Sequence, residues 1–249
     1  MQTQLPVKPR GRKIASVRAL RVLQQRSEAI RARVRAAVSG QLGQDPSPAG
    51  LVDAAVCAHA ALDNEGRRAL ARPGAPEPAC SAGCSYCCHV HADASAPEIL
   101  AVASHIRRAF SPAAQGELRR RLADQVSRVE HLSDEARWEA KIPCALLGDD
   151  GRCSIYEARP LRCRAFHSCS VAPCREAFHG HDEAEAEPSP PLERAHDAVE
   201  HGYDEALTAA GLSAEGYRLE VGLLVALEEP EAGARWVAGE PVFAKPPSP

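Results

Sequence analysis

The sequence has few aromatic and flexible apolar side chains, with 4% Phe, Trp and Tyr and a single methionine in 249 residues. Much of the apolar 45% is alanine, so we expect a core of small, helix-favouring residues. No run of about 18 apolar residues occurs, so we predict no membrane-spanning helix. The N-terminus also lacks the apolar segment and small-residue cleavage site of an export signal, so we predict a cytoplasmic protein.

Several common catalytic signatures are missing as well. We find no glycine-rich phosphate loop, no GxSxG elbow and no HExxH helix, so no nucleophile paired with a base is visible. The formal net charge of −3 argues against a general polyanion binder. The sequence leaves open whether the protein is an enzyme and whether it binds another protein. We do not expect it to bind membranes or nucleic acids.

Cysteine, in contrast, is abundant, with ten residues in the chain. Cys80, Cys84, Cys87 and Cys88 fall within nine residues, where thiolates repel one another unless a cation lies between them. A second set is spread over residues 144–174 and comprises Cys144, Cys153, Cys163, Cys169 and Cys174. In a reducing cytoplasm this pattern favours a metal site over disulfides. We interpret the isolated Cys57 as a buried apolar residue.

The periodicity predicts a mainly α protein, a helical domain around a cysteine-rich metal-binding centre with one or two short β-hairpins. One hairpin should carry Cys144 and Cys153 on its arms, and Ser95 with Glu98 should form a capping box. The expected helices cover residues 14–38, 51–71, 95–110, 111–131, 193–210 and 213–228. We predict four parts: a basic N-terminal extension with an amphipathic helix (1–50), the cysteine-cluster domain (51–180), an acidic, proline-rich linker (181–192), and C-terminal helices and tail packed on that domain (193–249).

The first cysteine run fits two family patterns. Cys80-x3-Cys84-x2-Cys87, with Tyr86 before the third cysteine, is similar to the radical SAM signature, in which three thiolates hold a [4Fe–4S] cluster. That resemblance implies strands alternating with helices and an open iron position. We predict no such strand series, and Cys88 offers a fourth thiolate, so this reading is the less favoured one.

The second pattern covers more of the chain. The CSAGCSYCC run, Pro143-Cys144 and the segment CSIYEARPLRCR together resemble the bacterial YkgJ-type cysteine-cluster family over about residues 79–175. Members are described as zinc- or iron-chelating proteins, and many have two residues, not three, between the first cysteines. The resemblance implies eight ligands, here Cys80, Cys84, Cys87, Cys88, Cys144, Cys153, Cys163 and Cys174. Zinc and an iron–sulfur cluster both suit such ligands.

Two roles remain open for the metal. The resemblance favours a metal-binding protein, and the related module of flagellin lysine N-methylases makes an iron–sulfur enzyme for methyl transfer or protein modification the alternative. His89, His167 and Glu98 are further candidate ligands. The arginines between the later cysteines could tune the site through N–H···S contacts, or brace the backbone; they are Arg152, Arg159, Arg162 and Arg164. We read the basic helix 14–38 as solvated, with a nucleic-acid contact or a targeting presequence as alternatives.

Overall fold

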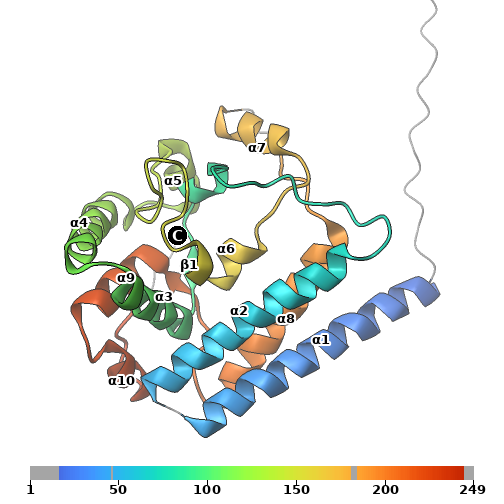
Figure 1. The fold of residues 1–249 in the computed structure, drawn as a ribbon, viewed down its shortest axis with the longest axis horizontal. Helices are drawn as coiled ribbons and strands as arrows, with labels where there is room; N and C mark the ends of the chain where they lie inside the picture. The colour runs from blue at the N-terminus through green and yellow to red at the C-terminus, as the bar shows by residue number, and fades with distance from the viewer. Residues whose placement is uncertain (1–16, 46, 181–183, 244–249) are drawn as a thin grey trace, which may run out of the picture.

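The computed structural model describes residues 17–45, 47–180 and 184–243, so parts of the predicted extension (1–16) and linker (181–183) lie outside the described residues. The described chain is mainly helical, as predicted (Figure 1). Its α-helices are α1 (Val17–Gln44), α2 (Pro48–Leu70), α3 (Ala96–Ala109), α4 (Pro112–Val129), α5 (Asp134–Ala140), α6 (Leu161–Ala165), α7 (Val171–Phe178), α8 (Pro190–Ala209), α9 (Leu219–Glu228) and α10 (Ala232–Val237). No helix in these ranges is long and apolar enough to cross a bilayer.

The three longest helices, α1, α2 and α8, each pack against the other two and form a bundle (Figure 1). The buried residues of α1 are Ile30, Val34, Val38 and Leu42, spaced four apart so that they share one face. Leu20, nearer the start of the helix, is 54% exposed. Helix α1 continues through Gly40 and Gly43 to Gln44, beyond the expected end at residue 38, and α2 begins at Pro48, before the expected start at residue 51.

Helix α3 occupies the centre of the molecule, packed on α2 and on α9, with α4 and α10 also against α9. A two-stranded antiparallel sheet joins its start to the start of α9, pairing β1 (Asp93–Ala94) with β2 (Tyr217–Arg218). These strands are distant in the sequence and do not form a hairpin. The capping box is confirmed, because the Ser95 backbone N–H donates to the Glu98 carboxylate at 2.9 Å.

The cysteine-bearing segments form a lobe of short helices and turns beyond α3. It contains α5, α6, α7 and the 3-10 turns η1 (Tyr86–His89) and η2 (Tyr156–Ala158). The expected hairpin is a tight turn closed by one antiparallel bridge between Leu147 and Cys153. The strand expected at residues 153–156 is wrong, because the chain there bends directly into η2.

Candidate metal centre

Backbone hydrogen bonds join the two cysteine regions. The Cys144 N–H donates to the Cys88 carbonyl at 2.8 Å, and the Ala79 N–H donates to the Ser168 carbonyl at 2.8 Å. The turn before Cys153 lies directly on the first run, since a Cβ on Gly151 would be 3.2 Å from the carbonyl oxygen of Gly83. The fold therefore brings together segments separated by more than fifty residues.

Five thiols share one environment, and we call them the inner thiols: Cys87, Cys88, Cys144, Cys153 and Cys163. Burial, reinforced by the charges of other inner thiols, raises the pKa of Cys144 to about 11 and that of Cys163 to about 12. A contact between the Cys87 and Cys88 thiols lowers the pKa of Cys87 and raises that of Cys88. Each inner thiol is therefore coupled electrostatically to at least one other.

A second group surrounds the start of the first run, and we call Cys80, Cys84 and Cys174 the outer thiols. Burial raises the pKa of Cys84, and the charges of Cys80, Cys87 and Cys174 raise it further. The Cys80 sulfur accepts from the Ser168 N–H at 3.4 Å. The eight predicted ligands thus fall into five inner and three outer thiols.

The two cysteines outside the predicted set behave differently. Burial raises the pKa of Cys169, as do the charges of Glu187 and Cys80, so Cys169 lies near the outer thiols. Burial alone raises the pKa of Cys57, which packs against the apolar core from α2. Cys57 is therefore apolar in its surroundings, as predicted, but only partly buried at the edge of the core.

The donor chemistry fits a thiophilic metal. All ten cysteines are free thiols. Within the described ranges, no three Cys, His, Asp or Glu side chains already stand close enough together to hold one metal ion. Binding would therefore need the sulfurs to move inward and lose their protons, which a cation favours by lowering thiol pKa values.

Of the four candidate tuning arginines, Arg159 alone is placed among the inner thiols. Its charge acts to lower the pKa of Cys87, Cys153 and Cys163. For Cys153 and Cys163 burial has the larger effect, so their pKa values are raised on balance. Its guanidinium lies 3.8 Å from the centre of the Tyr156 ring, which fixes its direction.

The other arginines have bracing or surface roles. Arg164 donates to the Arg159 carbonyl at 2.6 Å and pairs with Asp63 at 2.9 Å. Arg152 is exposed beside Asp150. Arg162 is also exposed, and burial raises the pKa of Glu200 although the charge of Arg162 opposes that rise.

The other candidate ligands are already engaged. His167 Nδ1 lies 2.7 Å from the Ala165 carbonyl, and its Nε2 accepts from the Ser189 N–H at 2.9 Å. His89 Nδ1 lies 3.1 Å from the Ser85 carbonyl, which leaves Nε2 as the atom it could offer. Glu98 accepts from the Leu161 N–H at 2.7 Å and so braces the start of α6, a structural role.

Comparison with known families agrees with this centre. Residues 79–188 match the model of the CxxCxxCC family, described as a "putative zinc- or iron-chelating domain". The matched segment is 110 of the 249 residues, from Ala79 to Pro188, and we refer to it as the CxxCxxCC segment or domain after the model that it matches. This match confirms the cysteine-cluster family suggested by the sequence. No curated protein and no solved structure matches the chain.

A buried charged network beside the CxxCxxCC thiols was missed by sequence reasoning. Arg137, 1% exposed, donates to Glu220 Oε1 at 2.7 Å, and His91 Nδ1 lies 3.1 Å from the same oxygen. The charges of Glu220 and Arg137 act on Cys144 in opposite directions. The sequence holds no signal for the network, because its members lie on α5, on α9 and before β1.

An aromatic cluster docks α7 on the first cysteine run of the CxxCxxCC domain. The Phe178 ring centre lies 5.4 Å from that of Tyr86, 4.8 Å from His89 and 5.8 Å from Trp138. Lys141 covers the outer face of Trp138, with Nζ 3.5 Å from the ring centre. Since α7 carries Cys174, this packing holds the third outer thiol near the first run.

Proposed function

We propose that the protein is a cytoplasmic metal-binding protein whose CxxCxxCC domain holds zinc or an iron–sulfur centre through the eight inner and outer thiols. The observation that carries the proposal is the mutual electrostatic coupling of the inner thiols across two chain segments. A cluster of buried thiols with raised pKa values contributes little to an apolar core. It becomes favourable when a cation replaces the protons.

The surroundings suit a negatively charged thiolate centre. A metal ion or cluster with four thiolates carries net negative charge, and buried charge needs a nearby counter-charge. Arg159 supplies one at the inner thiols. On the Cys144 side, Arg137 is paired with Glu220, whose charge raises the pKa of Cys144 more than Arg137 lowers it, so Arg159 is the counter-charge that this arrangement offers. The inner and outer thiols would serve two separate metal positions.

The test is the metal and sulfide content of protein purified without oxygen. Iron with acid-labile sulfide and a brown colour supports an iron–sulfur centre, while a colourless protein with stoichiometric zinc supports a structural zinc site. Protein that contains neither metal, and takes up neither on reconstitution, contradicts the proposal.

A matched pair of variants locates the metal. Cys163→Ser should lower both metal content and thermal stability, because metal binding and folding are linked. Cys57→Ser, a change of the same chemistry in the apolar core, should leave metal stoichiometry unchanged. Equal metal loss in both variants would show that the assignment of ligands is wrong.

A further inference from the structure

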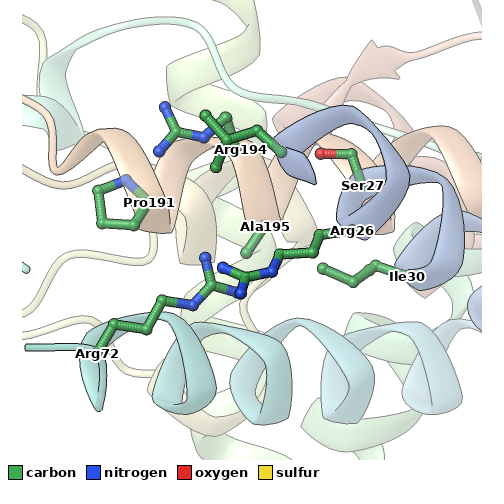
Figure 2. A pocket seen from close by; sticks show the side chains of 8 residues that line it. Arg26, Ser27, Ile30, Arg72, Pro191, Arg194 and Ala195 are labelled. Carbon is green, nitrogen blue, oxygen red and sulfur yellow. The ribbon is translucent and has the colours of Figure 1, made fainter. Parts of the chain in front are cut away.

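A hollow lies between α1, the C-terminal end of α2 and the first turns of α8 (Figure 2). Three arginines from these three elements line it, and we call it the three-arginine hollow: Arg26, Arg72 and Arg194. Its remaining lining is Leu23, Ser27, Ile30, Pro191 and Ala195. The hollow thus has a cationic rim and a largely apolar floor.

Among the described residues, the charge of this rim has no carboxylate partner. In the described parts of the chain, none of the three guanidinium groups has an ion pair or side-chain hydrogen bond with a carboxylate. Arginines further along α1 do have such partners, since Arg31 pairs with Glu205 and Arg33 with Glu65 at 2.8 Å. The missing counter-charge is therefore a local feature of the hollow and not of the helix as a whole.

The arrangement of the arginines makes that imbalance unfavourable. Figure 2 shows the side chains of Arg26 and Arg72 extending into the hollow from facing walls. Like charges that line one hollow repel, and an apolar floor formed by Ile30 and Ala195 reduces the screening by water. An anion between the guanidinium groups would convert this repulsion into attraction.

We propose that the three-arginine hollow binds a phosphoryl group, either free phosphate or the terminal phosphate of a small metabolite. The planar fork of a guanidinium matches two phosphate oxygens, and arginines on three sides can serve different oxygens. The Ser27 hydroxyl at the edge can donate a further bond. The start of α8 contributes only its dipole, because Pro190 and Pro191 carry no N–H.

The lining of the hollow favours a single phosphoryl group over a nucleic-acid strand. A strand would need a longer basic track with aromatic faces for its bases. The hollow has no aromatic lining residue. All residues that line the hollow lie outside residues 79–188, so this inference does not depend on the metal centre.

The experiment measures thermal unfolding and titration calorimetry of the metal-loaded, full-length protein with inorganic phosphate, against chloride at matched ionic strength. Phosphate should raise Tm in a concentration-dependent way. Arg72→Gln and Arg26→Gln should each weaken phosphate binding by about tenfold or more, as expected for the loss of one charge-assisted hydrogen bond. In chloride alone, Arg72→Gln should unfold at the same temperature as the parent or higher, because a repulsive pair is removed.

The control is Arg21→Gln, an exposed arginine on α1 that does not line the hollow and should keep the phosphate response. A parallel titration with glycerol phosphate distinguishes the sources, since tighter binding of the ester indicates a metabolite and equal binding indicates free phosphate. The proposal is overturned if phosphate has no effect, or if all three variants respond equally. Binding of a single-stranded oligonucleotide that depends on Arg21 as much as on Arg72 would also overturn it.

Discussion

The buried network of Arg137, Glu220 and His91 offers a sharp test of the structure. Glu220→Gln keeps the size of the side chain but leaves the Arg137 guanidinium, 1% exposed, without its counter-charge. Breaking a buried ion pair by removing one partner costs about 3–5 kcal/mol. In a chain of this length about 1 kcal/mol corresponds to roughly 2–4 °C, so Tm should fall by about 6–20 °C.

The matched control for this change is Glu229→Gln. Glu229 also pairs with an arginine, Arg235 at 2.6 Å, but both side chains are nearly half exposed. Removing an exposed pair costs at most about 1 kcal/mol. Urea unfolding followed by circular dichroism measures both variants, and equal losses would refute the assignment of a buried network.

The pH dependence gives the same experiment a second readout. Burial raises the pKa of Glu220, but His91 and Arg137 lower it more, so the folded pKa lies below the ordinary value of 4.5. A lowered carboxyl pKa stabilises the fold above the unfolded value, and this stabilisation is lost as pH falls through the folded pKa. The difference between the parent and Glu220→Gln should therefore be constant near neutral pH and shrink below about pH 4.5. A difference that stays unchanged down to the acid transition would contradict this reasoning.

Three further changes test other parts of the fold. Gly202→Ala would place a Cβ 2.6 Å from the Arg31 carbonyl oxygen and should lower the free energy of unfolding in urea by about 1–3 kcal/mol. Its control is Gly116→Ala, in open space, which should raise that free energy by about 0.5–1 kcal/mol. If the two variants changed the free energy of unfolding equally, the close α1–α8 contact would be contradicted. Phe178→Ala should release α7 and reduce metal bound at the outer thiols, and unchanged metal stoichiometry would count against that docking. Hydrogen bonds to Glu98 outweigh its burial and lower its pKa, so Glu98→Gln should reduce the stability lost on acidification, and an identical acid profile would exclude this role.

Sequence reasoning succeeded where the structural signal is local. Ser95 with Glu98, and Ser111 followed by Pro112, are start signals contained in one helical turn, and α3 and α4 begin where they predict. The same reasoning placed the break after α1 too early, because glycines at 40 and 43 are tolerated inside a helix that packs on two neighbours. In that segment, tertiary packing outweighed the low helix propensity of glycine.

The sequence by itself determined the helical class, the cysteine-cluster family and the absence of a spanning helix from any part of the chain described. These depend on residue spacing along the chain, which the printed sequence contains. Only the tertiary structure shows that the thiols form an inner and an outer group. It also shows that Arg159, and not Arg164, lies among the inner thiols, and that Arg137 pairs with Glu220. The physical reason is that buried charge and thiol coupling depend on distances across the fold, and residues far apart in sequence acquire those distances only when the helices pack.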